Sequence, residues 1–152
     1  MINVLGIYSE KPSEFQSRLI EALENNENIS RLLRIAKIEK FEVYFQINIP
    51  LNGSYFHVLG LRKILYIGIE DITIETINKV VIVLAHEIGH IFGSKTESED
   101  SPLPERIKEE ILAWKIAQRL LKGFLSKKDN KLAFLEISSK GINSRVFKLT
   151  TE

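Results

Sequence analysis

The chain contains no cysteine among its 152 residues. Disulfide frameworks, thiol proteases, thioredoxin-like redox sites, zinc ribbons and iron–sulfur clusters are therefore excluded, because each of them requires cysteine sulfur. Any metal site in this protein must use His, Asp or Glu. Histidine is also scarce, since His57, His86 and His90 are the three imidazoles of the chain. These positions are the first candidates for metal ligands.

Long hydrophobic runs are also absent. The longest apolar run extends from Val80 to Ala85, far below the ~20 residues that a membrane-spanning helix needs. Met1 to Tyr8 contain no basic residue, and Glu10 follows at once, which is not the pattern of a secretory signal peptide. We therefore expect a cytoplasmic protein that does not act at a membrane.

The composition is that of an ordinary folded domain, with 44% hydrophobic and 27% charged residues. Neither an internal repeat nor a linker rich in Pro, Gly and Ser interrupts the chain, so we expect a single domain over 1–152. The net charge is +1, but Lys and Arg are concentrated in 115–152. The C-terminal end is therefore a candidate basic patch.

Hydrophobic periodicity divides the chain into consecutive segments. Apolar residues at helical spacing predict helices over 12–24 and about 32–38, then over 76–92 and from 101 to about 122. Gly93 is expected to follow the third helix as its C′ residue. The expected organisation is a helical scaffold over 1–40, a sheet over 41–70, metal-site helices over 76–122 and a basic C-terminal segment over 123–152.

The sheet is predicted from a change of period from 3.6 to 2. Apolar and polar residues alternate over 41–49 up to Pro50, and the Asn52-Gly53 pair that follows is typical of a tight hairpin. Further strands are expected over 54–58 and 63–69, with a turn between them. The predicted fold is α+β, a small zincin-like domain in which an antiparallel three-stranded meander packs on two helices.

The segment with the most specific chemistry is His86-Glu87-Ile-Gly-His90, an H-E-x-x-H motif on a predicted helix. Histidines four residues apart lie on one helical face, one turn apart, so that both imidazoles can bind one Zn²⁺ while Glu87 reaches a metal-bound water. The helix is apolar on most sides, and burial of these groups is costly unless something binds them. The alternative is a pair of core histidines with a solvated Glu87.

A catalytic zinc ion usually has three protein ligands, so a third must come from elsewhere in the chain. In the metzincin pattern it would be a histidine where this sequence has Thr96, and the only methionine, Met1, rules out that family's Met-turn. On the helix that follows, Glu110 lies near the centre of an apolar stripe, whereas Glu109 lies off its edge. We predict zinc ligands at His86, His90 and Glu110, the alternative being an ion pair of Glu110 with a buried Lys or Arg.

This arrangement resembles the gluzincin metallopeptidases, in which H-E-x-x-H is followed by a glutamate on a second helix. The run from Ala85 to His90, with Glu110-x-x-Ala-x-x-Ile-Ala-x-x-Leu-Leu, is similar to the ImmA/IrrE-like family. Leu112 stands where that family has a second acid, and Ile116 replaces an aromatic residue. The resemblance covers about 80–121, and minimal gluzincins are an equally acceptable relative.

The resemblance implies a zinc-dependent endopeptidase with one zinc ion per chain, Glu87 as the catalytic general base and a protein or peptide substrate. It also implies that a sheet edge holds the substrate in extended form, for which 63–69 is the candidate strand. ImmA/IrrE-like proteins act on transcriptional repressors, so a repressor is a candidate partner. Candidate substrate or oxyanion contacts are His57, Tyr55 and Tyr66, although ordinary packing of strand residues is the alternative.

A second hypothesis comes from the basic C-terminal end, where aromatic residues are interspersed among the cations. It is a regulatory or nucleic-acid-binding protein in which the H-E-x-x-H site is structural or vestigial. The residues that support it are Lys122, Phe124, Lys127, Lys128, Lys131, Phe134, Lys140, Arg145, Phe147 and Lys148. Steep salt dependence of DNA binding would favour this hypothesis over the peptidase.

Overall fold

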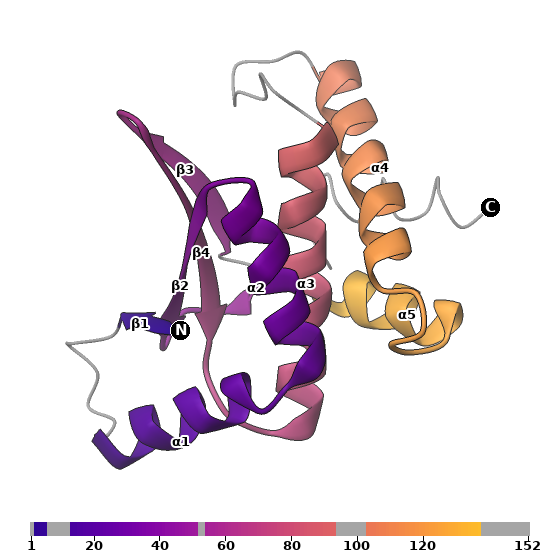
Figure 1. The fold of residues 1–152 in the computed structure, drawn as a ribbon. Helices are drawn as coiled ribbons and strands as arrows, with labels where there is room; N and C mark the ends of the chain where they lie inside the picture. The colour runs from indigo at the N-terminus through magenta and orange to yellow at the C-terminus, as the bar shows by residue number, and fades with distance from the viewer. Residues whose placement is uncertain (1, 6–12, 52–53, 94–102, 138–152) are drawn as a thin grey trace. The chain divides into compact units, whose positions relative to one another are not determined.

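The computed structural model describes residues 2–5, 13–51, 54–93 and 103–137 (Figure 1). The elements follow in the order β1 (Asn3–Leu5), α1 (Ser13–Glu24), α2 (Glu27–Ile38), β2 (Phe41–Ile47), β3 (Tyr55–Leu59), β4 (Arg62–Ile69), α3 (Ile74–Gly93), α4 (Leu103–Leu120) and α5 (Lys127–Ile137). The mixed α+β class expected from the sequence is confirmed. The chain divides into two compact units, 1–84 and 85–152, with the boundary inside α3.

The sheet of the N-terminal unit has the strand order β1-β2-β4-β3. β1 pairs with β2 and β2 with β4 in parallel, and β3 pairs with β4 in antiparallel orientation. The expected antiparallel three-stranded meander is therefore wrong, because β2 and β3 are not neighbours. β1, which the sequence pattern did not predict, adds a short parallel strand beside β2.

The path of the chain after β2 explains why no hairpin joins β2 to β3. Asn48 has a positive φ of 68°, and the chain then passes over Gly68 of β4, where an added Cβ would lie 2.3 Å from the carbonyl oxygen of Pro50. On the far side, the hydroxyl of Ser54 accepts a 2.9 Å hydrogen bond from the Gly68 amide. The chain thus reaches the opposite edge of β4 before β3 begins. The expected Asn52-Gly53 turn lies outside the described residues.

The second expected turn is confirmed, because β3 and β4 form a hairpin in which Leu59 pairs with Arg62 and Gly60 has a positive φ of 62°. β4 is paired on both sides and is mostly buried, which suits its nearly continuous apolar run, Ile64 to Ile69. Such a run is typical of a central strand. The expectation that 63–69 is a sheet edge for substrate is therefore wrong, and β3 is the edge beside it.

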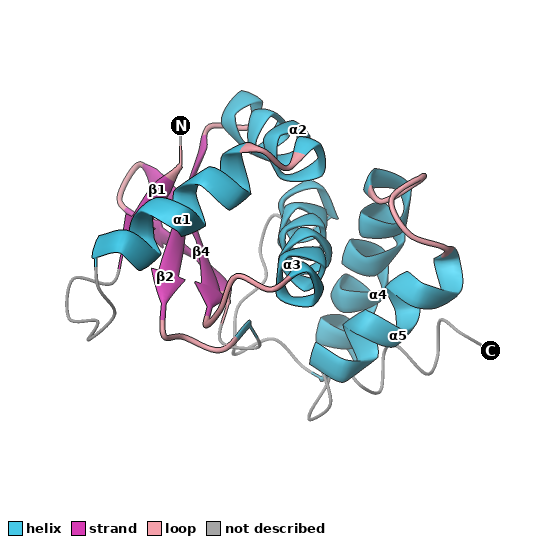
Figure 2. Ribbon diagram, turned by 90° about the horizontal axis from the view of Figure 1, so that it is seen from below, coloured by secondary structure: helices cyan, strands magenta, loops and turns pink. Residues whose placement is uncertain are grey.

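One face of the sheet forms the core of the N-terminal unit. Val43, Phe45 and Ile47 of β2 alternate with polar residues, and their register partners on β4, two residues apart, share that face. In the same unit α2 packs on β2 and α1 packs on α2 (Figure 2). α2 begins where the Asn26 side chain accepts a hydrogen bond from the amide of Ile29, an N-cap that fixes the start of the helix.

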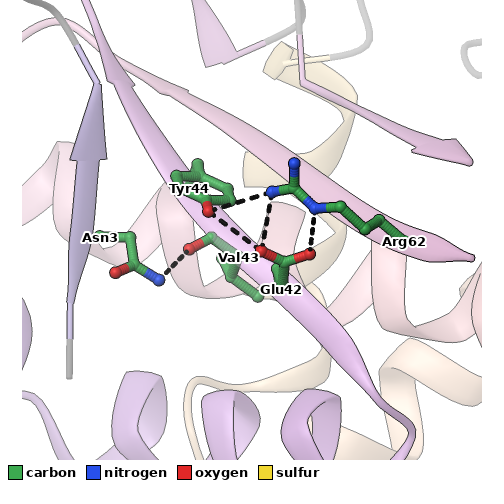
Figure 3. A network of polar contacts seen from close by, with 5 residues as sticks. All are labelled: Asn3, Glu42, Val43, Tyr44 and Arg62. Carbon is green, nitrogen blue, oxygen red and sulfur yellow. Dashed lines mark hydrogen bonds and ion pairs between the residues drawn. The ribbon is translucent and has the colours of Figure 1, made fainter. Parts of the chain in front are cut away.

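The other face of the sheet carries a polar and aromatic network (Figure 3). Arg62 of β4 donates two 2.9 Å hydrogen bonds to the carboxylate of Glu42 on β2, and the Tyr44 hydroxyl donates a third at 3.0 Å. The hydrogen bonds from Arg62 lower the pKa of Glu42. Beside them, the ring of Tyr66 lies 6.1 Å from that of Tyr44 and 5.0 Å from that of Tyr55. These side-chain contacts link β2, β4 and β3 on one face of the sheet and favour the observed pairing of the strands.

The C-terminal unit is built from the second half of α3 with α4 and α5. Gly93 is the last residue of α3 rather than the residue after it, and α4 ends at Leu120, close to the expected position. Gly123, with φ 84°, lies in the turn toward α5. α5 was not predicted, although Ser126 is a clear N-cap signal: its hydroxyl accepts a 3.0 Å hydrogen bond from the Asp129 amide.

Among the described residues, none of the helices is both long and apolar enough to span a membrane.

Candidate metal centre

His86 and His90 lie on the second half of α3, one helical turn apart. Every residue from Val80 to His90 is buried, so this part of the helix has no solvated face. The two histidines are 4% and 5% exposed, and Glu87 between them is 9% exposed. The H-E-x-x-H motif therefore places three ionisable side chains in an interior where unpaired charge is costly.

α4 approaches this part of α3 with unusual closeness. A Cβ added at Gly89 would lie 2.2 Å from the backbone oxygen of Ala113, so only a glycine fits at this crossing of the two helices. Glu110 lies one turn before Ala113 on α4 and therefore faces the same part of α3. Its side chain is buried, with 8% of the residue exposed. The short distance between the backbones lets a glutamate reach both imidazoles.

Three groups meet at this point. The Nε2 atoms of His86 and His90 are 3.1 Å apart, and the two carboxylate oxygens of Glu110 lie 3.0 Å from them, one oxygen on each imidazole. The imidazole planes are nearly perpendicular, at 82°. Around a tetrahedral ion with bonds of ~2.0–2.1 Å, neighbouring ligand atoms are about 3.3 Å apart. The spacing of the three groups is therefore close to that of a tetrahedral metal shell with three of its four positions filled.

Protons alone satisfy this arrangement poorly. Each Nε2 has a single position in the ring plane for either a proton or a lone pair, yet each lies within 3.1 Å of both the other Nε2 and a Glu110 oxygen. If both Nε2 atoms carried protons donated to the carboxylate, the two nitrogens would lie 3.1 Å apart as two donors with no acceptor between them. A cation at the centre receives a lone pair from each of the three groups and removes this conflict. The residues present therefore fit a metal ion.

The electrostatics of the site keep Glu110 in its charged form. Burial raises the pKa of this carboxyl, but hydrogen bonding to His86 and His90 outweighs burial and lowers the pKa to about 2. A carboxylate that stays ionised at neutral pH is available as a metal ligand without prior loss of a proton. His86, His90 and Glu110 form a buried cluster of the kind that can hold a metal ion.

The other acids of α4 are placed differently. Glu105 is exposed and Glu109 is partly exposed, and neither belongs to the cluster that the structure brings together. Trp114, on the same helix, is fully buried. The position of Glu110 in the apolar stripe of the predicted helix therefore identified the acid of α4 that faces the two histidines.

The expected substrate contacts belong to the N-terminal unit. Tyr55 and His57 are exposed on β3, and Tyr66 is half-buried on β4. Tyr55 and Tyr66 are register partners whose rings pack together, which is the ordinary packing considered as their alternative role. Their part in substrate binding stays a prediction.

The basic C-terminal end is described in part. Lys122, Phe124, Lys128 and Lys131 lie in the turn after α4 and on α5, and Lys127 is the first residue of α5. Lys140, Arg145, Phe147 and Lys148 lie outside the described residues. The nucleic-acid hypothesis built on them stays a prediction.

One contributor to the site was missed from the sequence. Gly89 and Ala113 make the close crossing of α3 and α4, and their signal was the small residue at each position, which allows two helices to approach closely. No protein-family model, curated protein or solved structure matches this chain significantly. The interpretation of the site accordingly rests on its own geometry.

Proposed function

We propose that this protein is a zinc-dependent endopeptidase of the gluzincin type, in which His86, His90 and Glu110 hold the metal. The observation that carries the proposal is the convergence of two imidazole nitrogens and one carboxylate within 3.1 Å. Two imidazoles and a carboxylate are a donor set found in catalytic zinc sites that leave one position open. The motif around them supplies a fourth side chain, Glu87, that is not needed as a ligand.

Zinc bound in such a site polarises a scissile carbonyl and lowers the pKa of a coordinated water. Glu87 is next to His86 on α3 and is buried, so its carboxylate is the proton acceptor nearest the ligands in sequence. In the proposed reaction a Glu87 oxygen takes the proton of the attacking water and later gives it to the nitrogen of the leaving amine. One carboxylate thus acts first as general base and then as general acid.

The three proposed ligands come from two helices. His86 and His90 are fixed by one helix, so their spacing is set by the helical repeat, whereas Glu110 comes from α4 and completes the site from outside. An extended peptide substrate needs an unpaired strand edge for main-chain hydrogen bonds. Among the described strands, β3 lies at an edge of the sheet and β4 is paired on both sides, so β4 is not proposed as the substrate strand. A transcriptional repressor as substrate stays a prediction from the resemblance.

The first test is the metal content of the purified protein and of single variants, after weakly bound metal has been removed. About one zinc per chain in the wild type, its loss in His90→Ala and Glu110→Ala, and its retention in Glu109→Ala would support the three-ligand site. Glu109→Ala is the matched control because it removes the neighbouring carboxylate on the same helix. A folded wild type that binds no zinc when zinc is in excess would overturn the proposal, and iron in place of zinc would point to oxygen chemistry instead.

The second test separates binding from catalysis. Glu87→Gln keeps the size of the side chain but cannot accept the proton of water, so we expect unchanged zinc content and a loss of peptide hydrolysis of at least about a hundredfold. Cleavage of an unfolded protein substrate is followed by electrophoresis and mass spectrometry. Undiminished hydrolysis by Glu87→Gln would show that this residue is not the general base.

A further inference from the structure

A second candidate site lies elsewhere in the C-terminal unit. A cavity of about 560 Å³ lies between the end of α4 and the start of α5, beside the turn at Gly123. None of the three proposed metal ligands lines it. Its volume is in the range of cavities that bind small molecules, ~300–1,000 Å³.

Three cations line the cavity, and no described residue pairs with them. Lys115, Arg119 and Lys122 follow one another at spacings of four and three residues, so they lie along one side of α4 and its end. All three are exposed, and none forms an ion pair with any side chain in the described ranges. Within the part of the chain that the structure describes, no carboxylate lines the cavity. Asp129, in the first turn of α5, accepts a 2.7 Å hydrogen bond from the Ser126 hydroxyl.

A buried asparagine also lines the cavity. Asn130 on α5 is 5% exposed and lines the cavity. Its Nδ2 donates a long hydrogen bond of 3.4 Å to the carbonyl oxygen of Leu125, and its Oδ1 has no hydrogen-bond partner among the described residues. A buried acceptor left without a donor is costly. A ligand that brings an O–H group into the cavity would satisfy it.

Leu121 and Leu125 give the wall an apolar part, and Gln118 and Gly123 complete the described lining. The lining is therefore complementary to a molecule that has an anionic group, a hydroxyl donor and an apolar carbon skeleton. A phosphate monoester combines these features, because it carries one to two negative charges at neutral pH and its monoanion retains a P–OH donor. Arg119 adds a planar fork of donors that suits phosphate oxygens.

We propose that this cavity binds a small organic phosphate monoester, with the phosphate between Lys115, Arg119 and Lys122 and the carbon body against Leu125. The site is separate from the metal centre and does not depend on peptidase activity. It would give the protein a means of responding to a phosphorylated small molecule.

The test is a calorimetric or NMR titration of the full chain with phenyl phosphate and, separately, with inorganic phosphate. We expect saturable binding of one phenyl phosphate per chain, with weaker binding of inorganic phosphate because it lacks the carbon body. Arg119→Gln should weaken both by roughly tenfold, the effect of losing one charge-assisted contact. Leu125→Ala should weaken phenyl phosphate alone.

Two controls make the result specific. Lys108→Gln removes an exposed cation of α4 outside the cavity and should leave binding unchanged. Glu110→Ala should also leave it unchanged, whereas a phosphate bound at the metal centre would be lost in this variant. Absence of saturable binding, or equal binding by Arg119→Gln, would overturn the proposal. Tighter, strongly salt-dependent binding of a DNA oligonucleotide that Arg119→Gln weakens would also overturn it, and would assign these cations to nucleic acid.

Discussion

At the scale of single residues, Glu110 has the most unusual environment in the described part of the chain. It is a buried carboxylate whose partners are two imidazoles and whose pKa is lowered to about 2. A carboxyl with a lowered pKa stabilises the folded state above its ordinary pKa of 4.5, and this contribution disappears as the pH falls toward 2. Glu110 thus couples the stability of the metal-free protein to acid pH.

This coupling gives a pH prediction. In metal-free protein at pH 5 to 6, Glu110→Gln should lower the free energy of unfolding by about 3 kcal/mol, the amount that corresponds to the lowered pKa. The difference from the wild type should shrink as the pH falls from 4.5 toward 2, because the wild-type carboxylate then becomes protonated. Urea denaturation at several pH values measures it, with Glu109→Gln as the control. A difference that does not change with pH would refute the assigned role of the charge.

At the scale of elements, the crossing of α3 and α4 decides whether the metal site can form. The contact at Gly89 involves the backbone of Ala113, which cannot move without the helix. Gly93, one turn later on α3, would place a Cβ 3.0 Å from the side chain of Leu112, which can rotate. The two glycines therefore offer a matched comparison between a rigid and an adaptable neighbour.

We expect Gly89→Ala to push α4 away from α3 and to weaken zinc binding by at least about tenfold, because a displacement of this kind moves Glu110 out of the coordination shell. Gly93→Ala should retain nearly wild-type affinity. Competition with a chromophoric zinc chelator gives both values, and circular dichroism checks that each variant is folded. Equal affinities would show that the crossing tolerates a side chain at Gly89.

α5 provides a prediction about a helix terminus. The Ser126 side chain caps this helix through the amide of Asp129, and replacement of such a cap by alanine usually costs about 1 kcal/mol. Ser126→Ala should lower the free energy of unfolding by that amount, measured by chemical denaturation. Ser126→Asp, which preserves an acceptor at the cap, should restore most of the loss, whereas equal destabilisation by both variants would contradict the cap.

At the scale of the whole molecule, the sequence predicted local features better than pairing. The helix that carries H-E-x-x-H and the inward orientation of Glu110 could be predicted, because each depends only on the spacing of residues within its own helix. Strand partners do not, since the alternation in β2 is the same for either neighbour and the crossing over Gly68 depends on contacts distant in sequence. The continuous apolar run of β4 is typical of a parallel central strand. The Asn52-Gly53 pair, which is typical of a tight hairpin, favoured the antiparallel prediction instead.

Metal removal tests the molecule as a whole. A ligand that binds only the folded state raises its stability, by about 2.7 kcal/mol when its concentration is a hundred times the dissociation constant. For a chain of this length we expect zinc at that excess to raise the melting temperature by about 5–10 °C. Glu110→Ala should show little or none of this rise. A similar rise in both proteins, followed by differential scanning calorimetry, would place the stabilising zinc elsewhere.

The division of the ligands between two helices has one more consequence. Glu110 lies twenty residues after His90, so an ion bound by both closes a loop in a chain that has no cysteine to form a covalent cross-link. Closure of such a loop restricts the unfolded chain, in the same way as a disulfide, by an amount that grows only slowly with loop length. The proposed metal centre would therefore also act as a reversible cross-link. Its contribution to stability depends on the concentration of free metal ion rather than on redox conditions.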